Sequence, residues 1–348
     1  MLAGSSSAAT AVEITPSGRL HLDYARHDSD VTQFDDRFLV RRAQLGLEAK
    51  FSHDWSAKLV YDFAAGGSVK DAYLRYGGWK RAEFTLGQFK VPFGLEQLSS
   101  TNETSFIEKA LPSAAFSLSR RKGLGLESHG PRHTFAAMGF GSSIGGNEGR
   151  GAAARFTFTP VNHGQTLLHL GLAASTEWPS APVNFGARPE ALPTDVRLLR
   201  TGTIGEVGRI DQLGLEAAWR QGPWSLQSES MHSHLRRNLG NPDLNFHGWY
   251  VAGSWLLTGE ARDYHDGVFK GVTPAGRGGA WELTARYSHL GLDDGTVRGG
   301  NENNVTLGVN WYCNDHLRFM VNYIRVNSER HGIADDPSLV DARAQITF

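Results

Sequence analysis

The sequence has only one cysteine, Cys313, in 348 residues. A single cysteine excludes a disulfide framework within one chain and any metal site built on several cysteines. Charge of one sign is not in excess either. The 35 basic and 36 acidic residues leave a net charge of −1, so no overall positive field attracts nucleic acid. We therefore expect no nucleic-acid partner, and any basic site has to be a local concentration of charge.

Long apolar runs are also missing. No stretch of 18 apolar residues occurs, which excludes a transmembrane helix. A membrane is not excluded, because a spanning β-strand needs only about ten residues, of which alternate ones are apolar. Hydrophobic residues make up 40% of the chain, whereas glycine is abundant at 41 residues, together with 18 Phe, 9 Trp and 9 Tyr. This composition is typical of an all-β protein with many turns.

Apolar and polar residues alternate with a period of two from one end of the sequence to the other. In residues 39–51, Leu45 and Leu47 share an apolar face, while Gln44 and Glu48 share the opposite face. Strand spacing separates such residues, whereas helical spacing would scatter them around the axis. The alternation predicts sixteen strands, at residues 17–27, 36–51, 54–65, 68–77, 80–89, 121–129, 131–141, 150–160, 164–175, 209–220, 223–236, 245–258, 279–291, 301–313, 315–327 and 339–348.

Two properties distinguish a membrane barrel from a large soluble β protein, which is the competing interpretation. Many of the segments are longer than the five or six residues of a usual soluble strand. Short connections also interleave with long ones, as in outer-membrane barrels, although residues 259–277 break this rule. The long connections are residues 28–35, 90–120, 176–208 and 329–337. The polar face carries too many charges for a dry core, so the interior has to be wet.

We therefore predict a sixteen-stranded antiparallel transmembrane β-barrel that lies in outer-membrane lipid and encloses water. The barrel domain is expected at residues 17–348, after an N-terminal periplasmic segment at residues 1–16. The segment 196–204 alternates as well, but an extra strand would make the count odd, so we assign it to a loop. The C-terminal Phe348 fits an outer-membrane barrel.

No group of residues forms a catalytic pattern, and we expect neither an enzyme nor a cofactor. Residues 139–149 are rich in glycine but lack the Lys-Ser/Thr ending of a phosphate-binding loop. His232 and His234 could share one strand face, but no carboxylate or third histidine lies close in sequence, so we expect no metal site. The alternative class is an enzyme or adhesin on a barrel; an enzyme would need a nucleophile and a base at the rim.

The 90–120 segment is too long for a hairpin connection. Residues 102–111 predict a short helix, because a polar cap precedes Phe106 and Ile107, and Pro112 follows the expected end. Folded against the inner wall, this helix would narrow the pore and present Lys109 to the lumen. An external cap is the alternative.

Alternation sends Arg42 and Arg121 into the lumen. Between low-dielectric walls, a few arginines raise the local anion concentration even at zero net charge, and the guanidinium fork suits phosphate oxygens. Alternatively these arginines pair with inward acids and hold the wall together, and both roles can coexist. The inward acids are Glu48, Asp62, Asp71, Glu83 and Glu127.

Several segments are recognisable. They are LVRRAQLGLEAKFSHDWSAKLVYDFA (39–64), KDAYLRYGG (70–78), LGQFKVPFGLEQLSS (86–100), ALPSAAFSLSRRKGLGLE (110–127), LGLEAAWRQGPWSLQSE (213–229), GWYVAGSWLLTGE (248–260) and NNVTLGVNWYCNDHLRFMVNYIRV (303–326). Together they resemble the phosphate-selective porin O and P family, and the resemblance covers nearly the whole chain after about residue 17.

The resemblance implies a bacterial outer-membrane porin that assembles as a homotrimer, has its third loop folded inside, and passes phosphate or other small anions. It also implies an anion pathway of basic residues from strand two, loop three and loop five, with an aspartate and its neighbour on strand four. By motif position these residues are Arg41, Arg42, Lys109, Arg188, Arg197, Arg200, Asp71 and Tyr73. A general or small-organic-solute porin with little ion selectivity is the remaining alternative.

Overall fold

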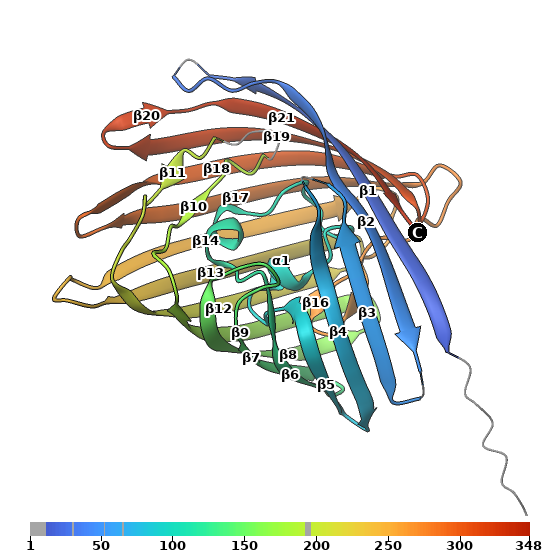
Figure 1. Ribbon diagram of the computed structural model, residues 1–348. Helices are drawn as coiled ribbons and strands as arrows, with labels where there is room; N and C mark the ends of the chain where they lie inside the picture. Colours follow the sequence, from blue (N-terminus) through green and yellow to red (C-terminus); the bar gives the residue numbers. More distant parts are fainter. Residues whose placement is uncertain (1–11, 30, 52, 65, 192–195) are drawn as a thin grey trace, which may run out of the picture.

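The computed structural model describes residues 12–348 except 30, 52, 65 and 192–195. Long antiparallel strands form one closed sheet (Figure 1). β1 (Glu13–Asp28) pairs with β2 (Arg37–Lys50) on one side and with the last strand, β21 (Ser338–Thr347), on the other, which closes the ring. β1 starts earlier than the predicted residue 17. Most of the predicted segment 1–16 lies outside the described residues.

The remaining barrel strands follow one another in chain order. They are β3 (Trp55–Asp62), β4 (Ser68–Trp79), β5 (Ala82–Lys90), β6 (Arg120–His129), β7 (His133–Phe140), β8 (Gly149–His163), β9 (Thr166–Pro179), β12 (Val207–Gln221), β13 (Trp224–Arg237), β14 (Leu244–Leu256), β17 (Ala280–Asp294), β18 (Val297–Tyr312) and β19 (Leu317–Arg330). The short β20 (Ile333–Asp335) extends the hairpin between β19 and β21. The prediction of a sixteen-stranded antiparallel barrel is confirmed.

The outer face of the barrel is apolar, as lipid requires. Leu215 on β12 and Leu307 on β18 point outward and are 54% and 51% exposed. At the short-turn ends of the strands, tryptophans stack across neighbouring strands: Trp224 with Trp255 at 4.6 Å between ring centroids, and Trp281 with Trp311 at 5.5 Å. Such a belt of aromatic rings is typical of a membrane–water interface. No helix in the described part of the chain is long and apolar enough to cross a membrane.

Three connections pack against the inner face of the strands. Loop 3 (residues 91–119) contains α1 (Leu95–Leu98) and α2 (Leu111–Phe116), and Figure 1 shows α1 inside the ring. Loop 5 (residues 180–206) contains the hairpin of β10 (Gly186–Ala187) and β11 (Leu199–Arg200), so the segment 196–204 does not form a barrel strand. The inner turn (residues 257–279) contains β15 (Tyr264–His265) and β16 (Val268–Phe269).

These connections share an apolar core with one side of the barrel. Phe116 of loop 3 and Phe185 of loop 5 pack with Phe246 of β14, at 5.7 Å between the centroids of successive rings. The inner turn places Phe269 against Leu95 of α1. Loops 3 and 5 and the inner turn therefore fill the barrel along β12–β19 and leave the β1–β6 side less covered.

The helix predicted at residues 102–111 is wrong: the helices of loop 3 lie on either side of this segment. Pro112 occupies the first turn of α2, where proline is favoured, and does not follow a helix end. The segment between the helices satisfies its backbone groups with side chains of the wall. Asn322 accepts from Ile107 N at 2.8 Å, and Asn310 donates to Ser105 O at 2.8 Å. This path of turns and bends therefore has partners for its backbone groups in the barrel wall.

Candidate functional site

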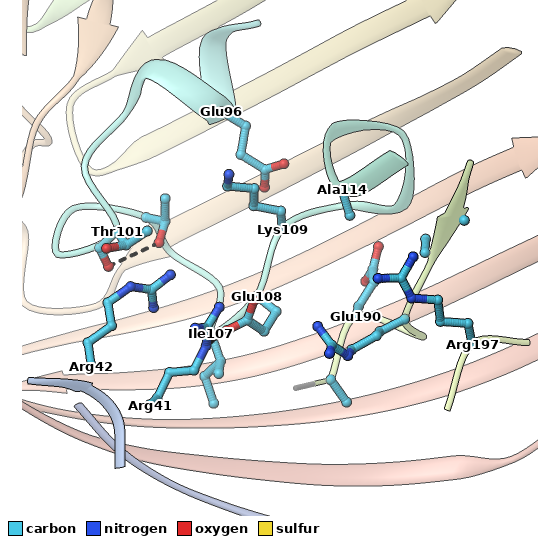
Figure 2. A pocket seen from close by; sticks show the side chains of 15 residues that line it. Arg41, Arg42, Glu96, Thr101, Ile107, Glu108, Lys109, Ala114, Glu190 and Arg197 are labelled. Carbon is cyan, nitrogen blue, oxygen red and sulfur yellow. Dashed lines mark hydrogen bonds and ion pairs between the residues drawn. The ribbon is translucent and has the colours of Figure 1, made fainter. Parts of the chain in front are cut away.

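The inner loops and β2 enclose a cavity of about 200 Å³ in the lumen. It brings together five of the predicted site residues, namely Arg41, Arg42, Lys109, Arg188 and Arg197. Figure 2 shows their surroundings, with side chains that converge from β2, loop 3 and loop 5. The polar lining that the sequence analysis did not identify consists of Glu96, Thr101, Thr104, Glu108 and Glu190.

Two consecutive arginines reach the same cavity because β2 contains a bulge. His21 of β1 pairs with Arg42, but the next residue, Leu22, pairs with Val40, so Arg41 is an extra residue in the ladder. A bulge interrupts alternation and redirects side chains. Strict alternation would have turned Arg41 toward lipid. The bulge therefore allows both Arg41 and Arg42 to line the cavity.

The acids of the cavity are neutralised from behind, by arginines of the wall. Arg286 of β17 lies 3.2 Å from Glu96 and 2.6 Å from Glu190. Glu108 is 3.0 Å from Arg41 and 3.1 Å from Arg343 of β21. Arg286 and Arg343 do not line the cavity, and their side chains are at most 1% exposed. Glu96 and Glu190 therefore have their arginine partner outside the cavity, whereas Glu108 also pairs with Arg41, which lines it.

Arg42 is the clearest uncompensated cation. Its NH1 atom lies 3.5 Å from the His21 ring, and no carboxylate within the described ranges forms an ion pair with it. A guanidinium held in this way keeps donors available for an anion that enters the cavity.

Loop 3 contributes two charges of opposite sign. Burial lowers the pKa of Lys109 to about 8, although Glu96 and Glu108 favour the charged form. Burial alone would raise the pKa of Glu108, but Arg41, Arg343 and Arg42 outweigh burial and lower it. At pH 7 both groups are thus charged, and only Lys109 changes its charge at mildly alkaline pH.

Four of the predicted residues do not line the cavity. Arg121 points inward as predicted, but it pairs with Glu148 at 3.4 Å and Glu177 at 3.3 Å, so it holds loop 4 (residues 141–148) and β9 to the wall. Arg200 is exposed on β11, where its backbone pairs with Gly186.

The other two lie on β4. Asp71 is bound by Arg120 at 2.6 and 3.1 Å, a bidentate pair that occupies its carboxylate. Tyr73 packs at 6.1 Å from Phe89, under the guanidinium of Arg75. Asp71 and Tyr73 thus lie outside this cavity, and their place in the anion pathway stays a prediction.

Basic residues that the sequence analysis did not select extend the positive wall along β1–β6. Arg19 donates to Thr101 at 3.2 Å, and Lys90 donates to the carbonyls of Leu98 and Ser99 at 2.9 Å. Lys70 is the extra residue of a second bulge, between β3 and β4, and lies within electrostatic reach of Arg41, Arg42 and Arg120. Bulged and strand-end lysines escape a strict alternation rule, which is why the sequence analysis missed them.

Solvent exposure indicates where water passes. On the β1–β6 side, Lys58, Lys70 and Arg75 have side chains that are 33–34% exposed. Charged residues on the opposite wall, such as Arg318 and Glu282, are at most 3% exposed beneath the loops. Charged side chains on the β1–β6 side are therefore more accessible to water than those beneath the inner loops.

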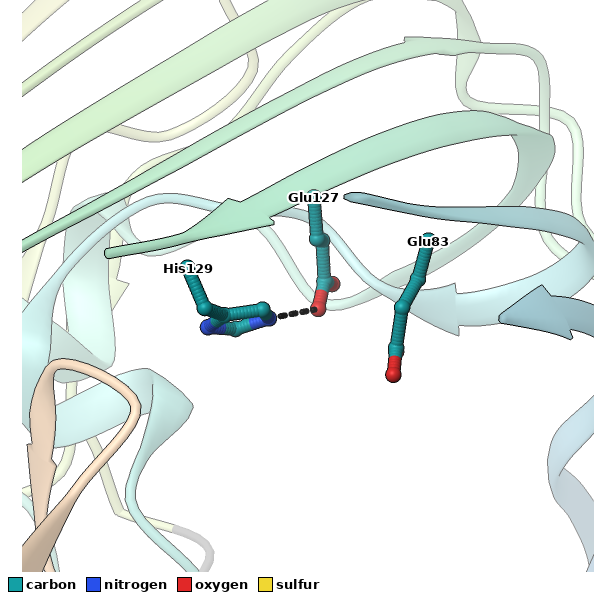
Figure 3. Close-up of side chains that lie close together, drawn as sticks. All are labelled: Glu83, Glu127 and His129. Atoms are coloured by element: carbon teal, nitrogen blue, oxygen red, sulfur yellow. Dashed lines mark ion pairs between the residues drawn. The ribbon is translucent and has the colours of Figure 1, made fainter. Parts of the chain in front are cut away.

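One carboxylate–imidazole cluster lies at the short-turn end. Glu83, Glu127 and His129 each place a potential ligand atom within 4.8 Å of the others. Figure 3 shows the three side chains next to one another. Arg75 already pairs with Glu83 at 3.1 Å, and Asp266 lies 3.4 Å from His129. The side chains are about one-third exposed, so the cluster is a solvated charge network that could accommodate a cation. The sequence analysis considered only the pair His232 and His234 as possible metal ligands and did not identify this cluster.

A closed sixteen-stranded barrel with an apolar outside and charged side chains in its lumen is typical of an outer-membrane porin. Residues 14–348 match the phosphate-selective porin O and P family, and the chain belongs to that family. It is 24% identical to Porin O of Pseudomonas aeruginosa over 90% of this chain and 82% of that protein. It is also 28% identical to an uncharacterized protein of Caulobacter vibrioides, over 88% and 67% of the two chains.

Solved porins share the fold. The anion-selective porin from Comamonas acidovorans has a TM-score of 0.64 at 13% identity, covering 97% of this chain and 100% of its own. OmpT of Vibrio cholerae, in its trimer form, has a TM-score of 0.65 at 12% identity with the same coverage. The protein is thus a channel of the bacterial outer membrane and not an enzyme.

Proposed function

We propose that this porin passes anions in preference to cations, with phosphate or related small anions as its solutes, and that the cavity residues select them. The observation that carries the proposal is the uneven compensation of charge. Arg286 and Arg343, which lie outside the cavity, pair with Glu96, Glu190 and Glu108, whereas Arg42 keeps its donors. Among the cations that line the cavity, Arg41 pairs with Glu108. An entering anion exchanges part of its hydration for these donors and for Lys109, and it leaves again because the cavity stays hydrated.

A reversal potential measured across a planar bilayer in a KCl gradient tests the proposal. We expect a sign that corresponds to chloride permeation, and a fall in chloride current when phosphate is added. A reversal potential near zero, with no effect of phosphate, would instead favour a general porin for small organic solutes. Repeating the measurement with a dicarboxylate separates phosphate preference from a general preference for divalent anions.

We also propose a homotrimer. The solved structure of OmpT, which shares the fold, is described as a trimer form, and closed symmetry is usual for assemblies of identical chains. Chemical cross-linking in mild detergent should yield a ladder that ends at three chains. A pattern that stops at one chain would rule out the trimer.

A further inference from the structure

Glu190 of loop 5 has an unusually complete set of hydrogen-bond donors. Arg286 donates to its Oε2 atom at 2.6 and 3.1 Å, and Thr306 of β18 donates to the same atom at 2.6 Å. Ser288 of β17 donates to Oε1, which also accepts from the backbone N of Leu111 at 3.2 Å. The side chain is fully buried. Two barrel strands and loop 3 thus hold one carboxylate of loop 5.

The position of Glu190 affects Arg188 through the backbone that joins them. Glu190 has a φ of 56°, a left-handed conformation that costs energy for a residue with a side chain and persists where its surroundings enforce it. Its backbone N donates to Arg188 O at 2.7 Å, and Pro189 stands between them with a fixed φ. A displacement of the Glu190 carboxylate would therefore move Arg188, which lines the cavity.

The same guanidinium also holds loop 3. Arg286 NH1 donates to Glu96 at 3.2 Å and to the carbonyl of Glu108 at 3.1 Å, and the guanidinium lies 4.3 Å from the Phe106 ring centroid. Glu108 immediately precedes Lys109. One arginine of the wall thereby fixes the relative position of the two loops that carry the cations of the constriction.

We propose that Glu190 is a positioning residue for anion selection: bound to Arg286, it sets where Arg188 stands relative to Lys109. This role rests on the anion preference proposed above. A positioning role and a purely electrostatic role predict opposite changes in anion preference when Glu190 is replaced. Removing a negative charge from the lumen should by itself increase anion preference. If Glu190 positions Arg188, its replacement instead decreases that preference.

The test measures the anion-to-cation permeability ratio in planar bilayers for three variants. Glu190→Gln removes the charge, and Glu190→Asp keeps the charge but shortens the side chain. Thr306→Val removes a single donor from a residue that does not line the cavity. We expect Glu190→Gln and Glu190→Asp to lower the ratio at least about twofold, in line with couplings within one hydrogen-bond network. Thr306→Val should lower it less, with the same sign.

Glu206→Gln is the matched control, because Glu206 is an exposed acid of the same loop outside the cavity. It should leave the ratio unchanged or raise it slightly. Heat-modifiable gel mobility reports whether each variant folds, and Thr306→Val keeps the test open if a Glu190 variant does not fold. A higher ratio for Glu190→Gln, with Glu190→Asp and Thr306→Val equal to wild type, would overturn the positioning role. The wild-type reversal potential separately tests the anion preference itself.

Discussion

The Nε atom of Arg41 lies 3.0 Å from Oε1 of Glu108, so the bulged residue of β2 is joined to loop 3 by an ion pair. Arg42, the next residue, faces the cavity, and among the described residues its one hydrogen-bond neighbour is His21, at 3.5 Å. The two arginines therefore differ in function although they are adjacent in sequence. Arg41 attaches the loop, and Arg42 supplies positive charge to the pathway.

Replacing Arg42 by Glu should weaken or invert the anion preference. At about 8 Å in water, a change of two charges alters the energy of one monovalent ion by about 1 kcal/mol, which is about fivefold in the permeability of that ion. Arg237→Glu makes the same charge change at the long-loop end of β13 and should have little effect. The reversal potential in a salt gradient distinguishes the variants. Equal effects of both substitutions would mean that overall charge, and not the cavity, sets the selectivity.

Anion preference should fall as pH rises through about 8. Lys109 is charged below its lowered pKa of about 8 and neutral above it, so alkaline pH removes a cation from the constriction. Reversal potentials recorded between pH 6.5 and about 9.5 should follow this titration. Lys109→Arg stays charged across the range and should abolish the dependence, whereas Lys109→Met should show the alkaline behaviour at every pH. A slope retained in Lys109→Arg would assign the titration to another group.

The barrel was predictable from sequence because each strand buries one face and exposes the other, and a period of two records that division directly. The two bulges could not be predicted, because each interrupts the alternation at a single residue, Arg41 or Lys70. Each is a charged residue that stands next to another charged residue in the sequence. Pro112 is compatible with the start of a helix as well as with its end, so the loop 3 helix was misplaced. Only the structure shows that Pro112 lies at the start of a helix and not after its end.

The charge pairing of the cavity was equally inaccessible. Arg286 lies on the inward face of a predicted strand, but its partners Glu96 and Glu190 are 190 and 96 positions away in the chain. Such pairs depend on how the inner loops fold, and alternation carries no information about loops. The sequence therefore indicated which side chains face inward but not which of them remain available to a solute.

Removing the guanidinium of Arg343 should destabilise the barrel strongly. Arg343 is fully buried and binds Asp23 at 2.7 Å through two nitrogens, as well as Glu108 at 3.1 Å. Arg343→Met leaves these carboxylates without that partner, and breaking a buried pair costs about 3–5 kcal/mol. Tryptophan fluorescence during denaturant unfolding from lipid vesicles gives the free energy. Arg325→Met, at an exposed position, should cost less than about 1 kcal/mol.

Deleting Arg41 should be tolerated by the fold, because it removes only the extra residue of the bulge. Val40 and Arg42 then become consecutive in a regular ladder opposite Leu22 and His21, and every other side chain keeps its face. The barrel should fold with its heat-modifiable mobility intact. Anion preference should decrease without inverting, since Arg42 stays in place while loop 3 loses its ion pair with β2.

Deletion of Ala43 provides the matched control for this experiment. If the bulge absorbs that deletion, Arg42 moves into the outward position of Ala43, opposite Leu20. An arginine that faces lipid costs about 2–4 kcal/mol near the bilayer midplane. The Ala43 deletion should therefore fold poorly where the Arg41 deletion folds well. Equal folding of both variants would show that β2 does not depend on this register, and the explanation given for two lumen-facing arginines would have to be abandoned.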